Sequence, residues 1–331
     1  MPGAHSIRTW ACRDVERGNA IMIAVTGASG HLGQWVVARL TQLGFEVLCI
    51  SRSPINFPRI PELVWERPVH TLVCDITDPV SVEACSQQLC EAETFVHLAG
   101  HVPDDTARNT PEDAASTLHA NVLGSIHLLK ALSNSTRLSS LVYASTFEVY
   151  GGPRRIPIDE DHPTQPFGYY GASKLAVEKF VSLFSLDRGV PACSLRFSAI
   201  YGPGDRLKRA IGNFVRAAAS GEELVVQGDG FDLRELVYAG DAAEAVVLAI
   251  QKRPSCVINI ASGIGYTINE IADTVLRVAD DKVRLVHRER VKERTDYVMT
   301  IDRARDILDW KPSTTIEEGV RAQLGWVRAC G

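Results

Sequence analysis

Tyr170 and Lys174 stand four residues apart in the stretch YYGASK. If this stretch is helical, the phenol and the ammonium lie one turn apart on the same face. A free phenol has a pKa of about 10, and a cation about 4 Å away contributes roughly 4 kcal/mol at an effective dielectric of about 20, which is enough to bring that pKa to about 7. The pair therefore predicts a tyrosine that exchanges protons near neutral pH. The same spacing also occurs on solvated helix faces, so other parts of the sequence must support this interpretation.

A glycine-rich turn, TGASGHLG (26–33), follows the first expected strand and opens the first expected helix. Gly27 permits a tight turn, Gly30 lets the backbone approach a pyrophosphate, and Gly33 allows close packing of helix on sheet. The helix N-terminus then faces the anion. The pattern predicts a dinucleotide-binding turn, whose other candidate cofactor-binding residues are Ser29, His31 and Leu32.

The ends of the following strands supply further candidates for cofactor binding. The second strand ends in Ile50-Ser51-Arg52-Ser53, which lacks the acid that binds a ribose 2′-hydroxyl. An arginine there suits the 2′-phosphate of NADP, so Arg52 favours NADP over NAD, against a plain surface position as the alternative. Asp75 and Ile76 are placed to meet the adenine. The small segment expected to admit ribose and pyrophosphate consists of Leu98, Ala99 and Gly100.

Short, continuously apolar strands alternate with helical patterns through the first two thirds of the chain. We expect strands at 21–27, 46–52, 70–76, 94–100, 141–146 and 192–198, and helices at 33–44, 81–89, 114–134 and 170–187. Strands that are apolar on both faces, with helices between them, indicate an α/β fold with a doubly wound parallel sheet of the Rossmann type.

The pattern changes after residue 202. Helices are expected at 206–220, 241–251, 269–279 and 302–309, with a lone strand at 223–228 and a strand at 256–262 that returns to the main sheet. We therefore predict a Rossmann domain at 21–202, rejoined by 239–262. A smaller C-terminal substrate-binding lobe is formed by 203–238 and 263–331. Residues 1–20 are expected to be a disordered tail.

Composition excludes several classes of function. The chain has 331 residues, a net charge of −5, 45% hydrophobic and 23% charged residues, which does not suggest a nucleic-acid partner. Its apolar runs are too short to span a membrane. The eight cysteines form no Cys-x-x-Cys motif and no disulfide framework, and the histidines do not cluster. No metal site is expected, and a reducing, cytoplasmic location is predicted.

Several segments occur in one characteristic order: TGASGHLG, CDITD, HLAG, YASTFEVYG, YYGASK, LRFSAIYGPG and RELVYAGD. Together they resemble the extended short-chain dehydrogenase/reductases, in the nucleotide-sugar epimerase/dehydratase branch that includes UDP-galactose 4-epimerase. The resemblance runs from about residue 21 to the C-terminus, where DWKPSTTIEEGV (309–320) is similar to the terminal pattern of that branch.

The resemblance implies roles for individual residues. Tyr170 would be the acid/base, Lys174 would bind the nicotinamide ribose and lower the Tyr170 pKa, and Thr146 would hydrogen-bond the reacting oxygen. The backbone at Phe197 would lie near the nicotinamide carboxamide. The implied reaction is hydride exchange with NAD or NADP at C4 of a nucleotide-diphosphate sugar, by a 4-epimerase or a 4-ketoreductase.

Departures from the family pattern bear on the reaction. Similar 4,6-dehydratases have an acid or a serine where this chain has Phe147, which cannot donate a proton, while the carboxylate at Glu148 is retained. A dehydratase or decarboxylase that uses Glu148 is therefore an alternative. The other interpretation of Glu148 is a carboxylate that only accepts a hydrogen bond from the backbone. Ser198 stands where many relatives have an asparagine that contacts the diphosphate. Arg234 matches an arginine that meets a phosphate or ribose, with a surface ion pair as the alternative.

Two further alternatives differ in function class. One is an NADP-dependent reductase of a non-sugar carbonyl, and the other is a non-catalytic protein that senses NADP. The family also implies a homodimer formed by helices at 114–134 and 174–186. Apolar residues that suit this interface, or equally the core, are Leu118, Val122, Leu129, Leu132, Val177, Val181 and Phe184.

Overall fold

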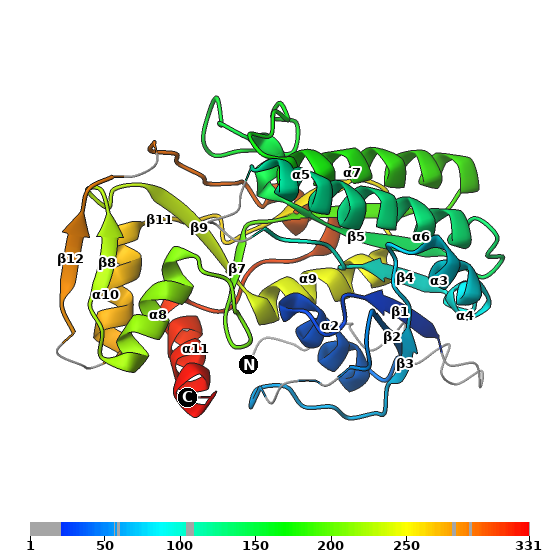
Figure 1. The fold of residues 1–331 in the computed structure, drawn as a ribbon, viewed down its shortest axis with the longest axis horizontal. Helices are drawn as coiled ribbons and strands as arrows, with labels where there is room; N and C mark the ends of the chain where they lie inside the picture. The colour runs from blue at the N-terminus through cyan, green and yellow to red at the C-terminus, as the bar shows by residue number, and fades with distance from the viewer. Residues whose placement is uncertain are drawn as a thin grey trace.

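The fold is described from a computed structural model, which covers residues 21–55, 57, 60–103, 109–279, 283–290 and 293–330. The expected N-terminal tail, 1–20, lies outside these residues. Seven strands form the central sheet in the order β10-β6-β5-β4-β1-β2-β3, and every neighbouring pair is parallel (Figure 1). The strands are β1 (Met22–Thr26), β2 (Glu46–Ser51), β3 (His70–Val73), β4 (Thr94–His97), β5 (Ser140–Thr146), β6 (Ala192–Phe197) and β10 (Val257–Ile260).

Helices cover both faces of this sheet, so the predicted doubly wound α/β fold is confirmed. One face carries α2 (His31–Gln42), α9 (Ala239–Lys252) and the π-helical turn η3 (Ala304–Leu308). The other carries α3 (Pro79–Ala84), α4 (Ser86–Cys90), α6 (Gly124–Leu132) and α7 (Tyr169–Arg188). Successive residues of β5 serve opposite cores, since Val142 packs on the α2 and α9 side while Leu141 and Tyr143 pack under α6 and α7. This double burial explains the continuous apolar strands.

A second, smaller set of layers lies beyond the carboxyl edge of the sheet, at the left of Figure 1. It contains a three-stranded sheet of β7 (Ala199–Tyr201), β9 (Leu233–Tyr238) and β11 (Gly265–Thr267), and a parallel pair of β8 (Leu224–Gln227) and β12 (Leu285–Arg288). The helices are α8 (Ala210–Ser220), α10 (Ile268–Ala279) and α11 (Ile316–Cys330), which share one apolar core. The expectation of a lone strand at 223–228 was wrong, because β12 pairs with it along its whole length.

The helix predicted at 114–134 is interrupted. It begins as α5 (Pro111–Thr117), widens into the π-helical turn η1 (Leu118–Leu123) and continues as α6. Within that turn the Asn121 amide donates to the carbonyl of His101 at 3.1 Å and to the Ser173 hydroxyl at 3.0 Å, and its oxygen accepts the His101 N–H at 2.6 Å. The turn therefore joins the end of β4 to α7.

The apolar residues proposed for a dimer interface lie mostly in the core. Leu132, Val177, Val181 and Phe184 are buried beneath the sheet-facing sides of α6 and α7, so of the two alternatives they belong to the core. Val122 and Leu129 are half-buried against the same core, and Leu118 is exposed. Helical spacing identifies an apolar face but not its partner. The exposed apolar residues of these helices are Leu123, Ile126, Phe180, Leu183 and Leu186.

His97 ends β4 in a fully buried position. Its two ring nitrogens lie 2.8 Å from the Thr26 hydroxyl and 2.8 Å from the Ser125 hydroxyl. Burial, assisted by the nearby Lys174 ammonium, lowers the pKa of His97 from 6.5 to about 3. The imidazole is thus a neutral structural link between β1, β4 and α6.

This lowered pKa predicts acid sensitivity. The unfolded chain binds a proton at His97 between pH 6.5 and about 3 while the folded chain does not, so stability falls as pH falls through this window. The slope approaches about 1.4 kcal/mol per pH unit. Urea unfolding of wild type and His97→Gln across this range should show a shallower pH dependence in the variant. Exposed His70→Gln should match wild type, and equal slopes for all three proteins would refute the prediction.

Candidate active site

Lys174 lies buried where α7 crosses the carboxyl end of β5. Its ammonium donates to the Ala144 carbonyl at 2.9 Å and lies 5.9 Å from the centre of the Tyr170 ring and 5.0 Å from that of Tyr143. Burial lowers the Lys174 pKa to about 8, and the carboxylate of Glu178 opposes this shift. The side chain therefore stays mainly protonated at neutral pH, beside the half-buried phenol of Tyr170.

Thr146 is the last residue of β5, two positions beyond the carbonyl that holds Lys174. It pairs in register with Phe197, the last residue of β6. Its hydroxyl accepts the Glu148 N–H at 3.3 Å and caps the 3-10 turn η2 (Phe147–Tyr150). Thr146 thus ends the strand whose Ala144 carbonyl holds Lys174, at the carboxyl edge of the sheet, where open α/β sheets bind ligands.

A buried ion pair joins α7, the helix that carries Lys174, to the central sheet. The guanidinium of Arg196 binds the Glu178 carboxylate at 2.7 and 2.9 Å, and the Ser145 hydroxyl donates to the same carboxylate at 2.5 Å. Ser145 and Arg196 lie on β5 and β6, while Glu178 is one turn beyond Lys174 on α7. The sequence reasoning missed this pair, although a glutamate four residues after Lys174 was a visible signal.

The glycine turn forms the start of α2. Gly27 has a φ of +69°, and a Cβ there would lie 2.7 Å from the backbone nitrogen of Ala99. A Cβ on Gly33 would lie 2.1 Å from the Gly27 carbonyl oxygen. Gly30 caps α2 without any side-chain hydrogen bond, so the first N–H groups of the helix remain available to an anion. Such a cradle fits the pyrophosphate of a dinucleotide.

The other residues of this turn differ in exposure. Ser29 is exposed, while His31 and Leu32 are half-buried at the first positions of α2. Burial lowers the pKa of the His31 imidazole, and the carboxylate of Asp205, in the loop after β7, opposes this shift. The dinucleotide turn therefore contacts a segment that leads into α8.

The remaining cofactor candidates line the same edge of the sheet. Arg52 is exposed just after β2, and Asp75 follows β3 with its carboxylate bound to the N–H and hydroxyl of Thr77 at 2.9 and 2.7 Å. These bonds lower the Asp75 pKa, and Arg52 contributes. Ile76 is buried behind Asp75. Leu98, Ala99 and Gly100 follow β4, and a Cβ on Gly100 would lie 3.1 Å from the Lys174 ammonium.

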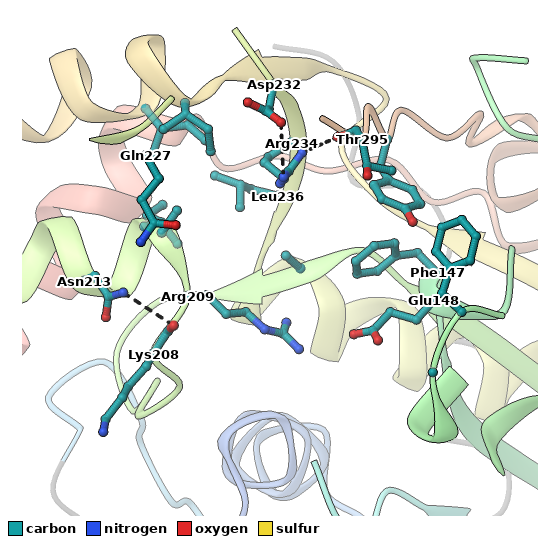
Figure 2. A pocket seen from close by; sticks show the side chains of 18 of the residues that line it. Phe147, Glu148, Lys208, Arg209, Asn213, Gln227, Asp232, Arg234, Leu236 and Thr295 are labelled. Atoms are coloured by element: carbon teal, nitrogen blue, oxygen red, sulfur yellow. Dashed lines mark hydrogen bonds and ion pairs between the residues drawn. The ribbon is translucent and has the colours of Figure 1, made fainter. Parts of the chain in front are cut away.

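A cleft of about 560 Å³ lies between the sheet edge and the second set of layers. Phe147 and Glu148 line one end, and Asn213 and Gln227 line the other (Figure 2). Tyr170 also lines the cleft. The Phe147 ring packs edge-on against Tyr297 at 4.9 Å, and the Tyr297 hydroxyl donates to the Gly151 carbonyl at 2.6 Å. Sequence reasoning gave no role to Tyr297, because nothing local marks it.

Arg234 and Ser198 occupy different positions relative to this cleft. Arg234, on β9, lines it and donates to the carbonyls of Leu233 and Thr295, with Asp232 at 3.8 Å. Ser198 does not line it. Its hydroxyl is buried and has no hydrogen-bond partner among the described residues.

Comparison with known proteins decides the family. The model of the NAD dependent epimerase/dehydratase family matches residues 23–261. The chain belongs to this family. It is therefore an enzyme of the NAD(P)-dependent, extended short-chain dehydrogenase/reductase class, as its motifs had indicated.

Two curated relatives show the range of reactions within the family. A UDP-glucose 4-epimerase of Streptomyces lividans is 28% identical over 307 residues, which cover 87% of this chain and 91% of the relative. A dTDP-D-glucose 4,6-dehydratase of Mus musculus is 27% identical over 321 residues, which cover 92% of this chain and 88% of the relative. This chain is thus similar both to an epimerase and to a dehydratase.

Solved structures agree with the fold. MoeE5 in complex with UDP-glucose and NAD superposes with a TM-score of 0.80 at 26% identity, covering 93% of this chain and 99% of MoeE5. The UDP-glucose 4-epimerase of Thermotoga maritima, with UDP-glucose, gives a TM-score of 0.83 at 24% identity, covering 94% and 99%. Among the described residues of this chain, no group of His, Cys, Asp or Glu side chains could hold a metal ion. No helix in the described part of the chain is long and apolar enough to cross a membrane.

Proposed function

We propose that this protein is an NAD(P)-dependent 4-epimerase of a nucleotide-diphosphate sugar. The carrying observation is that Lys174 is fixed to the Ala144 carbonyl 5.9 Å from the Tyr170 ring, near the end of β5 at Thr146, and that Tyr170 lines the cleft with the next residues of the chain, Phe147 and Glu148. The bound dinucleotide would accept hydride from a sugar carbon and return it. We further propose that the sheet domain, 21–202 and 239–262, holds the cofactor, and that 203–238 and 263–331 hold the substrate.

The side chains supply proton transfer and orientation. Tyr170, as phenolate, would take the proton of the C4 hydroxyl and later return it, and the hydroxyl of Thr146 would hold the same oxygen. The Lys174 ammonium, 5.9 Å from the phenol ring, would stabilise the phenolate. Because the ammonium is fixed to the Ala144 carbonyl, this stabilisation is in place before substrate arrives.

The test is whether the protein interconverts two nucleotide sugars that differ in configuration at C4. Incubation of the purified protein with UDP-glucose, monitored by proton NMR, should yield UDP-galactose without net consumption of cofactor. dTDP-, GDP- and UDP-sugars should be tried in parallel, because the base remains open. If none of these sugars is epimerised, reduced or dehydrated, the proposal is wrong, and a non-sugar carbonyl reductase or an NADP-sensing protein takes its place.

The cofactor separates an epimerase from a 4-ketoreductase. Arg52 supports NADP, and the complex of MoeE5 with NAD supports NAD. The dinucleotide released on denaturing the purified protein identifies the form it retains. Tightly retained, stoichiometric NAD+ would support the epimerase. Consumption of NADPH with a 4-keto sugar would support the reductase.

Dehydration or decarboxylation at Glu148 is the second candidate, because the dehydratase of Mus musculus is a relative and Glu148 lines the cleft. Phe147 counts against dehydration, since its ring packs on Tyr297 and offers no proton to a departing hydroxyl. A 4-keto-6-deoxy product from dTDP-glucose, detected by its carbonyl absorbance in alkali, would favour the dehydratase over the epimerase.

We also propose a homodimer and a cytoplasmic location. The exposed apolar residues of η1, α6 and α7 form a candidate interface, and light scattering of the purified protein would measure the assembly. The location is supported by free cysteines at buried positions, which suit a reducing compartment. The residues of the candidate interface are Leu118, Leu123, Ile126, Phe180, Leu183 and Leu186.

A further inference from the structure

The Lys174 ammonium is a buried cation that has no ion pair with a carboxylate among the described residues. Lys174 is only 4% exposed, and its ammonium donates a hydrogen bond to the Ala144 carbonyl. The carboxylate one turn further along α7, at Glu178, is bound instead to Arg196 and Ser145. Burial of a charge without a bound counter-ion favours the neutral form of the group. Another neighbour must therefore help to keep this ammonium charged.

Tyr143 presents the face of its ring to this ammonium. It lies in the middle of β5, and the Lys174 nitrogen lies over the ring, 5.0 Å from the ring centre. A cation within about 6 Å of an aromatic ring centre is attracted by the ring quadrupole, and the attraction is greater where water is excluded. Tyr143 is 1% exposed, so water is excluded on both sides of this contact. The pair therefore has the geometry of a desolvated cation–π interaction.

The Tyr143 ring is fixed by the strands on either side of it. In the sheet, Tyr143 pairs with His97 of β4 and with Ser194 of β6. The His97 ring packs against the Tyr143 ring at 5.5 Å between centres, and hydrogen bonds to the Thr26 and Ser125 hydroxyls hold that imidazole in turn. Because the His97 imidazole is neutral, it does not repel the ammonium. The ring is thus a fixed surface against which the ammonium can lie.

The hydroxyl of Tyr143 does not account for its position. This hydroxyl has no hydrogen-bond partner among the described residues, and a buried hydroxyl without a partner lowers stability. Burial raises the pKa of the Tyr143 phenol well above its ordinary value, so the phenol stays neutral at working pH. The contact that Tyr143 makes with Lys174 is made by its ring. The ring is therefore the part of this side chain that can act on the site.

The titratable groups that face Lys174 come from three elements: Tyr170 and Glu178 on α7, Tyr143 on β5 and His97 on β4. We propose that Tyr143 is a positioning residue, whose ring keeps the Lys174 ammonium charged and in place beside the phenol of Tyr170. This inference rests on the proposed function. An ammonium that moved away or lost its proton would stabilise the Tyr170 phenolate less. Tyr143 would therefore act on proton transfer through Lys174, without touching the substrate.

The direct test measures the Lys174 pKa and needs no sugar. The cofactor-loaded protein would be labelled with ¹³C at the lysine ε-carbon and titrated by NMR, and the Lys174 signal would be assigned by its absence in Lys174→Met. Tyr143→Leu should lower the Lys174 pKa by about one unit, which corresponds to a desolvated cation–π contact. Tyr143→Phe keeps the ring and should keep the wild-type pKa of Lys174.

Fluorinated phenylalanines at position 143 and a second aromatic residue separate the ring's charge effect from packing. Fluorine withdraws electron density from the ring face with little change in size, so the Lys174 pKa should fall stepwise through mono-, di- and pentafluorophenylalanine. This series decides the question even if Tyr143→Leu does not fold. Phe95→Leu is the matched control, since Phe95 is 1% exposed in the same core on β4. It should leave the Lys174 pKa at the wild-type value.

A constant Lys174 pKa across the fluorinated series would overturn the inference. An equal fall in Phe95→Leu would assign both rings to packing alone, and a fall in Tyr143→Phe would assign the effect to the hydroxyl; either result also overturns it.

The pH profile of kcat/KM, measured with a sugar that wild type converts, is the second measurement. Fluorination should move its alkaline limb to lower pH, as Lys174 loses its proton more easily, and its acid limb to higher pH, as the phenolate is less stabilised. An unmoved profile would overturn the role of Tyr143 in the reaction. If wild type converts no nucleotide sugar, the proposed function fails, while the NMR titration still decides whether the Tyr143 ring keeps Lys174 charged.

Discussion

Tyr170→Phe should lower turnover by about 10²- to 10⁴-fold, the usual contribution of a general acid/base. The variant removes one hydroxyl and leaves the ring beside Lys174, so cofactor affinity should change little. The measurements are the epimerisation rate by NMR and the dinucleotide affinity by titration. The effect should be confined to the rate, since the ring packing that orders the start of α7 is retained.

The neighbouring tyrosine provides the control for this prediction. Tyr169 is 45% exposed and precedes Tyr170 on the same helix. Tyr169→Phe removes an identical hydroxyl and should keep wild-type turnover. Full activity in Tyr170→Phe, or an equal loss in both variants, would show that the proton is transferred by another group.

Glu178→Gln should destabilise the fold by about 3–5 kcal/mol, because it leaves the Arg196 guanidinium charged and unpaired in the interior. Both side chains are almost fully buried, at 2% and 5% exposure. Urea unfolding monitored by circular dichroism would measure the change. The effect on activity should follow, because this ion pair joins α7, which carries Lys174, to β5 and β6.

A surface pair and a double variant complete the test. Glu317 and Arg321 form an exposed ion pair at 3.0 Å on α11, so Glu317→Gln should cost less than about 1 kcal/mol. The double variant Glu178→Gln with Arg196→Met should recover part of the stability, since the unpaired charge is gone. If Glu178→Gln were no more destabilising than Glu317→Gln, the ion pair would not support the fold as argued.

The sequence predicted the sheet domain well because its signals are local. Apolar runs mark strands that are buried on both faces, and the glycine turn marks the cofactor-binding helix. In the second set of layers, α8, α10 and β8 were predicted, but the other strands and the last helix were not. Its strands β7 and β11 have three residues each, and β9 carries the buried carboxylate of Glu235, so neither length nor hydropathy marks them. The helix α11 was missed despite apolar residues at helical spacing.

The residues of the candidate site also fall into those that a local sequence pattern predicts and those that it does not. Tyr170 and Lys174 are one turn apart, so a local pattern finds them. Tyr297 reaches Phe147 from 150 positions further along the chain, and Arg209 faces Glu148 from a different layer. Such contacts depend on how the layers pack, which no short segment of sequence specifies. Ser198 was named through the family resemblance alone, and its hydroxyl is buried and is not among the residues that line the cleft.

The π-helical turn η1 has a consequence for the chain's tolerance of length changes. A π-helical turn holds about one residue more than an α-helical turn, so the chain accommodates an extra residue here while α5 and α6 keep their buried faces. Removing one residue from this turn would let it close to regular α-helix, and Leu128 and Leu132 of α6 would stay in the core. The loss would fall on Asn121 and its bonds to His101 and Ser173. A single-residue deletion within α6, by contrast, would rotate the residues after it by about 100° and take Leu132 out of the core.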